Sequence, residues 1–245
     1  MPDKRKHRGP SPNDDRLFAS KNISVLRNAV ADMSLLLSRG YAQASTLKLV
    51  GDRYKLTRRQ RLAVMRCACS DDQLESRRRK QLTESDFRGG EAIIDGFNLL
   101  ITVEALLSGA PVFIGRDSCR RDLSGIHGSY RKVTETPQAF HLIANKLSEM
   151  NIKKALWRFD SPVSNSGMLK TMIGQIANEN GWPWVVELKL NPDKALMSAS
   201  KIVITSDSNV LDQCDKWFNF TEKLENTLEL AENGELNVID LSITG

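Results

Sequence analysis

The chain has 245 residues, of which 40% are hydrophobic and 27% charged, and its formal net charge at pH 7 is +5. This composition is typical of a globular protein with one large domain or two small ones. No apolar run is long enough to cross a bilayer, and the basic N-terminus lacks the apolar stretch of a secretory signal. The four cysteines fit reduced thiols better than a disulfide framework. We therefore expect a cytoplasmic protein with no membrane partner.

The positive charge is concentrated in the N-terminal part of the chain. Residues 1–90 contain 20 Lys and Arg against 10 Asp and Glu, whereas residues 91–245 contain 15 against 20. A basic part joined to a more acidic body indicates contact with a polyanion such as RNA or DNA. The alternative interpretation is a solvated, charged helical surface. The sequence leaves homo-oligomerisation open.

Two segments precede the more acidic body. Residues 1–14 are rich in Lys, Arg, Gly and Pro, which predicts a disordered basic arm. From residue 15 to residue 88 the pattern is that of a small helical domain. Its first apolar face recurs every three or four residues over 23–37, which predicts a helix that stops before Gly40.

Further helices are predicted in the same domain. One covers residues 42–50 and ends at Gly51. Another begins at Thr57, which has the capping-box spacing to Gln60, and a last one carries the basic run 77–80. A basic helix favours nucleic-acid binding, although a helical lid or interface domain is an open alternative. The candidate residues for nucleic-acid contact are Arg58, Arg59, Arg61 and Arg66.

Strands and helices alternate beyond a linker over residues 85–90. Residues 221–245 form an acidic segment with a helix over 222–231 and an edge strand near 236–243. Such alternation is typical of an α/β fold with a mainly parallel sheet. We therefore predict an α/β domain over residues 91–245, behind the all-helical domain. Its strands are predicted at 91–95, 111–114, 154–159, 184–190, 201–205 and 217–220.

Four aspartates stand at or just beyond the ends of predicted strands. In parallel α/β sheets the carboxyl ends of the strands share one edge, and ligands bind there. Clustered carboxylates repel one another unless a cation neutralises them, and their oxygens suit Mg²⁺ or Mn²⁺. Such an ion activates water for attack on a phosphodiester. The alternative is that these acids are caps and turn residues. The candidate catalytic and metal-binding residues are Asp95, Asp160, Asp193 and Asp207, with Glu104 and Asp122 as further candidate ligands.

Other residues near this edge are candidates to bind a phosphate group. The polar segment 115–130 is long for a connection inside a domain and carries several arginines. The turn after residue 160 leads into a helix, whose N-terminus favours an anion, although an ordinary N-cap is the alternative. The candidate phosphate ligands are Asn98, Arg116, Arg120, Arg121, Ser161, Ser164 and Ser166.

Two short motifs resemble those of PIN-like nucleases of the NYN type. The run Ile94-Asp95-Gly96-Phe97-Asn98 is similar to the first motif of that group. The run Thr205-Ser206-Asp207-Ser208 is similar to the late Thr-x-Asp motif of PIN domains.

The resemblance covers about residues 91–220, and Asp160 and Asp193 fit positions where such families carry acids. It implies a three-layer α/β sandwich and an Mg²⁺- or Mn²⁺-dependent ribonuclease, with Asp95 and Asp207 as metal ligands. The segment 111–130 departs from a compact PIN domain. The chain as a whole resembles an uncharacterised two-domain prokaryotic family.

Other classes of enzyme are poorly supported. Phe97 occupies the place of the second aspartate of haloacid-dehalogenase phosphatases, and the P-loop, dinucleotide and zincin motifs are absent. Neither His127 nor His141 accompanies a nucleophile elbow. The main alternative is a non-catalytic module that binds RNA or a nucleotide. An enzyme predicts at least three of the four aspartates within metal-bridging distance, whereas a binding module predicts a basic groove without such a cluster.

Overall fold

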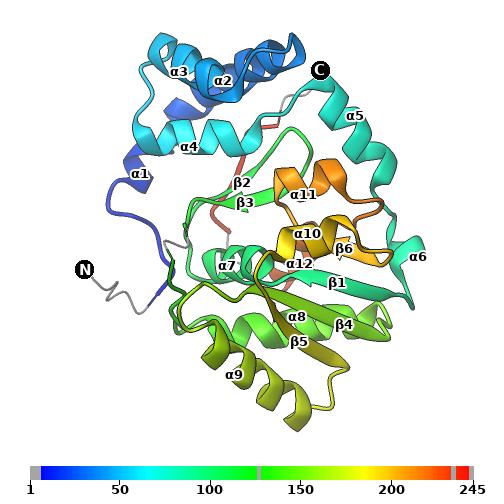
Figure 1. Cartoon of the computed structure of the whole chain (residues 1–245). Helices are drawn as coiled ribbons and strands as arrows, with labels where there is room; N and C mark the ends of the chain where they lie inside the picture. Colours follow the sequence, from blue (N-terminus) through cyan, green and yellow to red (C-terminus); the bar gives the residue numbers. More distant parts are fainter. Residues whose placement is uncertain (1–6, 126–127, 233–235, 243–245) are drawn as a thin grey trace.

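A parallel sheet of four strands lies at the centre of the C-terminal part of the computed structural model (Figure 1). The structure describes residues 7–125, 128–232 and 236–242. The strands run in the order β5–β4–β1–β6, which confirms the predicted α/β fold with a mainly parallel sheet. They are β1 (Glu91–Asp95), β4 (Lys154–Asp160), β5 (Trp184–Lys189) and β6 (Ile202–Ile204).

Helices cover both faces of this sheet, because its strands are apolar on both sides. In β1, Ala92 and Ile94 pack into one core and Ile93 into the other, as the twofold pleat of a strand requires. The result is three layers, with one helical layer on each face (Figure 1). The first core contains residues of α7 (Gly96–Leu107), α8 (Thr136–Glu149), α9 (Ser166–Glu179) and α12 (Phe220–Glu232), and the second contains residues of α10 (Pro192–Met197) and α11 (Ser208–Gln213).

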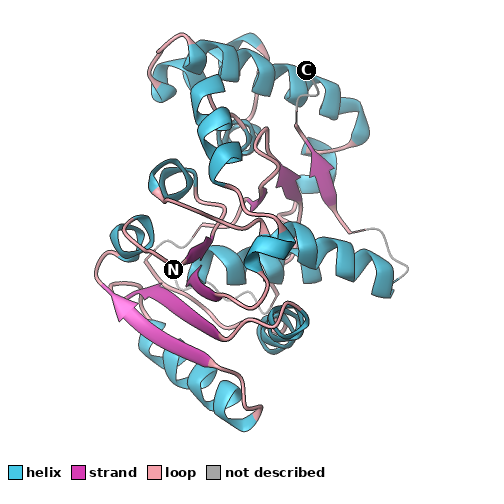
Figure 2. Cartoon of the chain, turned by 90° about the vertical axis from the view of Figure 1, so that its right-hand side faces the viewer, coloured by secondary structure: helices cyan, strands magenta, loops and turns pink. Residues whose placement is uncertain are grey.

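A smaller sheet joins the α/β part to the helical part (Figure 2). Its order is β3–β2–β7, in which β2 is antiparallel to β3 and parallel to β7. Phe113, Leu123 and Leu241 from this region share a core with Leu26 and Val64 of the helical part. The strands are β2 (Val112–Ile114), β3 (Arg120–Asp122) and β7 (Val238–Asp240).

The helical part follows the predicted pattern closely. Gly40 ends its long helix with φ +80°, and the Thr57 side chain accepts a hydrogen bond from the Gln60 amide in a complete capping box. The second predicted helix continues past Gly51, since this glycine makes room for the Arg61 side chain instead of ending the helix. The helices are α1 (Asp14–Leu17), α2 (Ser20–Ser38), α3 (Gln43–Arg53), α4 (Arg58–Cys67), α5 (Asp71–Lys80) and α6 (Glu84–Phe87).

Several predicted elements differ from the structure. The strand predicted at 217–220 is wrong, because Trp217 makes only isolated bridges and Phe220 already begins α12. The segment 115–130 is not a simple loop, since it contains β3. The linker predicted over 85–90 begins inside α6.

The basic arm was predicted to be disordered over residues 1–14. Residues 1–6 lie outside the described residues. For the rest of the arm the prediction is wrong, because Arg8 forms an ion pair with the buried Glu104 and His7 contacts Glu135. This part of the arm is therefore held against α7 and the start of α8.

The four cysteines lie inside the protein. All four cysteines are free and buried. Burial raises the pKa of the Cys67 thiol to about 12 and that of Cys69 to about 11. These groups therefore stay protonated and act in packing. Among the described residues, no helix combines the length and apolar character needed to cross a membrane.

Candidate functional site

The carboxyl edge of the central sheet gathers the four predicted aspartates. Asp95 and Asp160 are the last residues of β1 and β4. Asp207 caps α11 after β6, and Asp193 stands in the first turn of α10 after β5. Because the strands are parallel, these positions share one edge of the sheet.

Asp95 is the most perturbed of these acids. Its side chain is buried, and burial is the main reason that its pKa is raised to about 7. The charges of Asp207, Asp193 and Asp160 raise the pKa further, while a 2.7 Å hydrogen bond from Thr205 lowers it. The pKa values of Asp160 and Asp193 are also raised, first by burial and then by a neighbouring aspartate. The four carboxyl groups are therefore close enough to repel one another.

The four aspartates suit an ion that keeps most of its water ligands better than an ion bound directly by three or more side chains. Within the described ranges, no group of three or more acidic, histidine or cysteine side chains is arranged to hold a metal ion directly. The expected set of three bridging aspartates is therefore not met. Mg²⁺, however, usually keeps several waters and uses only one or two protein carboxylates. The oxygen donors and the mutual repulsion at Asp95 are compatible with such an ion.

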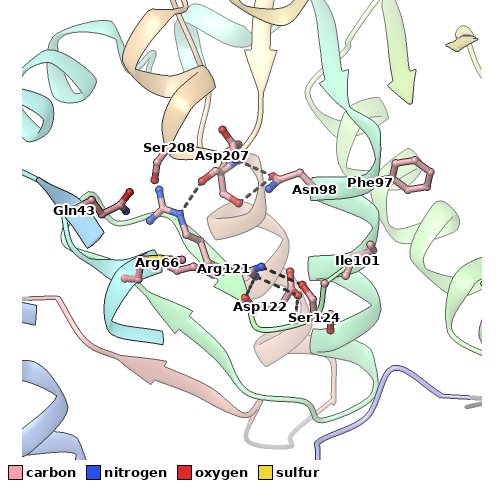
Figure 3. Close-up of a pocket in the computed structure, with 13 residues that line it drawn as sticks. Gln43, Arg66, Phe97, Asn98, Ile101, Arg121, Asp122, Ser124, Asp207 and Ser208 are labelled. Carbon is pink, nitrogen blue, oxygen red and sulfur yellow. Dashed lines mark hydrogen bonds and ion pairs between the residues drawn. The ribbon is translucent and has the colours of Figure 1, made fainter. Parts of the chain in front are cut away.

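Two side chains, Thr205 and Asn98, hold the loop that carries Asp207. Thr205 Oγ1 donates to Asp95 Oδ2 and accepts from the Asp207 amide at 3.0 Å. Asn98 Oδ1 accepts from the Ser206 amide at 2.8 Å and from its hydroxyl at 3.0 Å (Figure 3). Asn98, predicted as a phosphate ligand, thus uses its oxygen to position this loop.

A buried cluster of charges supports the same loop. Asp117 accepts from Arg77 at 2.6 Å and from both terminal nitrogens of Arg121 at 2.7 and 2.8 Å. Burial opposes ionisation, but the two guanidinium groups hold the pKa of Asp117 well below its usual range. Arg121 Nε donates to the Ser206 carbonyl at 2.7 Å, and Arg77 donates to the Ser208 carbonyl at 3.3 Å. Both carbonyls that flank Asp207 are therefore held by this cluster.

The arginines predicted to bind phosphate are engaged in ion pairs. Arg120 pairs with the buried Glu225 at 2.5 Å, and Arg116 pairs with Asp71 at 2.6 Å. Arg121 lines a pocket but is buried and paired with Asp117. These residues therefore stabilise the fold, and their prediction as phosphate ligands is wrong.

The two further candidate metal ligands, Glu104 and Asp122, already accept hydrogen bonds from other residues of the protein. Glu104 is fully buried and accepts hydrogen bonds from Tyr130 and Thr136, both at 2.6 Å, and from Arg8 at 2.7 Å. Arg8 neutralises it, so its prediction as a metal ligand is wrong. Asp122 accepts from Thr102 at 3.0 Å and from the Ser124 amide at 2.5 Å. Its carboxylate thus anchors β3 to α7.

Hydrogen bonds of main-chain amides and of one hydroxyl hold the serine-rich turn before α9. The amide of Ser161 donates to the Lys189 carbonyl, and the amide of Ser164 donates to the Gly128 carbonyl. Ser166 is buried, and its hydroxyl donates to the Ser161 carbonyl at 3.3 Å. These contacts give the turn a structural role and engage the Ser166 hydroxyl, while the role of Ser161 and Ser164 as phosphate ligands stays a prediction.

A pocket of about 350 Å³ opens beside Asp207 (Figure 3). The sequence motifs included some of its residues, but Gln43 and Met65 of the helical part were missed. No local pattern marks them, because they reach the pocket only through the packing of α3 and α4 on the α/β part. Its lining residues are Gln43, Met65, Arg66, Phe97, Asn98, Ile101, Arg121, Asp122, Ser124, Gly125, Ser206, Asp207 and Ser208.

The close approach of Gly96 to the sheet offers a direct test of the site geometry. A Cβ atom at Gly96 would overlap the Phe159 ring, so Gly96→Ala should shift Asp95 and cost about 1–3 kcal/mol in unfolding free energy. Gly167→Ala is the matched control, because Gly167 also lies in the first turn of a helix and faces open space. Urea unfolding of both variants measures the difference. Equal stabilities would contradict the predicted overlap, because they would mean that the Phe159 ring accommodates the added methyl group without cost.

The fold and the acidic edge define an α/β protein with a helical N-terminal part. Residues 84–223 match the family described as "Domain of unknown function (DUF5616)", and residues 25–80 match "Protein of unknown function (DUF434)". The chain therefore belongs to the DUF5616 family. It is 32% identical over 186 residues to the uncharacterized protein MJ0935 of Methanocaldococcus jannaschii, an alignment that covers 76% of this chain and 88% of that protein. No solved structure gives a significant match.

Proposed function

We propose that this protein is a metal-dependent nuclease that hydrolyses phosphodiester bonds, with RNA as substrate and Mg²⁺ or Mn²⁺ as cofactor. One observation carries the proposal: a buried Asp95 whose pKa is raised to about 7 by burial and by the charges of three further aspartates. A bound cation relieves this repulsion. The resemblance of the segments around Asp95 and Asp207 to motifs of PIN-like nucleases supports the same function. We expect this activity in the cytoplasm.

We assign each residue at the edge a role in this reaction. Asp95 and Asp207 would hold the ion, with Asp160 and Asp193 acting through its waters. One Asp207 oxygen caps α11, which leaves the other for the ion. The bound ion would polarise the phosphate and lower the pKa of a water molecule. Thr205 orients the Asp95 carboxylate, and the raised pKa of Asp160 suits it to accept a proton from the attacking water.

A non-catalytic RNA-binding module is the second candidate. The residues that the structure describes lack a direct three-ligand metal set, and Asp207 serves as an ordinary helix cap. Both facts favour a function without catalysis. In this case the four aspartates would serve only as helix caps and turn residues that stabilise the fold.

A cleavage assay separates the two functions. We expect the wild type to cut a labelled single-stranded RNA with Mn²⁺ or Mg²⁺ and not with a chelator. Asp95→Asn should lose at least as much activity as the roughly 10–100-fold typical of an outer-shell partner of a metal. The exposed Asp72→Asn is the control for loss of one negative charge. Tight RNA binding by a wild type that never cuts it would support the non-catalytic module instead.

A further inference from the structure

The pocket beside Asp207 continues into a second hollow along α4. The second hollow has a volume of about 750 Å³. It shares the residues Met65, Arg66 and Gly125 with the first pocket. Figure 3 labels Gln43 and Arg66 on one side of the first pocket and Asn98 and Asp207 on the other. The two hollows therefore adjoin, and together they are called here the α4 groove, which runs from Asp207 along α4.

The walls of the α4 groove combine cations with apolar side chains. Among the described residues, no acid lines the second hollow. Such a surface suits a polynucleotide, whose phosphates pair with guanidinium groups and whose base faces pack on apolar or planar side chains. The lining residues are Leu47, Arg58, Arg59, Arg61, Leu62, Met65, Arg66, Leu123 and Gly125.

The arginines of this groove differ in how available they are. Arg59 pairs with the buried Asp14, and Arg61 pairs with Asp52 at 2.8 Å. Arg66 donates to the main-chain carbonyls of Asp122 and Ser124, and its guanidinium group also forms an ion pair with the Asp122 carboxylate at 3.8 Å. Arg58 is exposed and makes no ion pair with any residue in the described ranges. Among the described arginines that line the second hollow, Arg58 is therefore the one without an ion pair.

We infer that the α4 groove binds a single-stranded segment of RNA next to the bond held at the acidic edge. This inference rests on the proposed function. The α/β part would hold the bond that is cut, and the helical part would bind the neighbouring stretch of the same RNA strand. The strand is unpaired because Leu62 and Met65, which are only partly buried, lie among the cations. Bases reach such side chains only when they are not stacked in a duplex.

Binding to oligonucleotides of different lengths tests the groove without cleavage. Fluorescence anisotropy in EDTA would compare labelled U4, U10 and a ten-base-pair RNA duplex. We expect wild type to bind U10 at least fivefold more tightly than U4 or the duplex. Arg58→Glu should weaken U10 binding at least fivefold and reduce the slope of log K against log salt by about 0.7 for each lost phosphate contact.

Two controls make the result specific. Lys21→Glu changes the charge equally at an exposed position of α2, outside the lining of the groove, and should alter U10 binding less than twofold. Arg58→Lys should retain most of the affinity. Equal losses in Arg58→Glu and Lys21→Glu, or equal binding of U4 and U10, would overturn the inference. Length-dependent binding by a protein that never cleaves RNA would reject the nuclease and leave the groove intact.

Discussion

Replacing Asp95 by asparagine should stabilise the metal-free protein above pH 7, although the same change should abolish nuclease activity. The pKa of Asp95 in the folded chain is raised to about 7, whereas an unfolded aspartate titrates near pH 4. Between these values the folded state binds more protons than the unfolded state, so stability falls as pH rises. Asparagine removes the buried charge and can still accept the hydrogen bond from Thr205.

The expected gain has a definite size and pH range. Each pKa unit corresponds to about 1.4 kcal/mol, so the gain should grow from pH 4 to pH 7 and reach at most about 4 kcal/mol. Urea unfolding in EDTA at pH 5 and pH 8 measures it, with Asp72→Asn as the exposed control. Millimolar Mg²⁺ should stabilise the wild type at pH 8 and not Asp95→Asn. If the difference in unfolding free energy between Asp95→Asn and the wild type were the same at pH 5 and pH 8, burial of the Asp95 charge would not be the cause of the gain.

Replacing Asp117 by asparagine should cause the largest loss of stability. Asp117 lies between the buried guanidinium groups of Arg77 and Arg121. Removal of its charge leaves both cations buried without their shared partner, and breaking a buried pair in this way costs about 3–5 kcal/mol. The Asp207 loop should also loosen, because the same arginines hold the Ser206 and Ser208 carbonyls.

A surface ion pair provides the comparison for Asp117→Asn. Asp71 pairs with Arg116, but its side chain is 68% exposed, so solvent screens the pair and Asp71→Asn should cost far less free energy than Asp117→Asn. Urea unfolding of both variants at pH 7 measures the contrast. If the two variants lost the same free energy, the buried cluster would contribute no more than a surface pair.

The central sheet was predictable because its signals are local. In β1, β4 and β6 an apolar run is followed by an aspartate at the end of the strand or just beyond it, and the parallel order follows from the alternation with helices. The capping box at Thr57 is likewise contained in four residues. Such features depend on neighbours in sequence, so the chain alone specifies them.

The smaller sheet and the roles of the arginines depend on distant partners. β2 pairs with β7, which lies more than a hundred residues away, so no window of sequence contains both strands. Arg120 looked free within its polar segment, yet Glu225 neutralises it. Charge and spacing identify an ionisable group, but only the tertiary structure shows whether another residue has already paired with it.

The boundary between the two matched family regions, at residues 80–84, lies where the two parts of the structure are closely joined. Just before this boundary, the Lys80 ammonium group donates to the carbonyls of Leu211 and Asp212, and just after it the Leu82 amide donates to the Trp217 carbonyl. At the other end, Leu241 enters the core of the helical part. A substitution in one region must therefore remain compatible with the other, and an exchange of one region with that of a distant relative would produce a mismatched core.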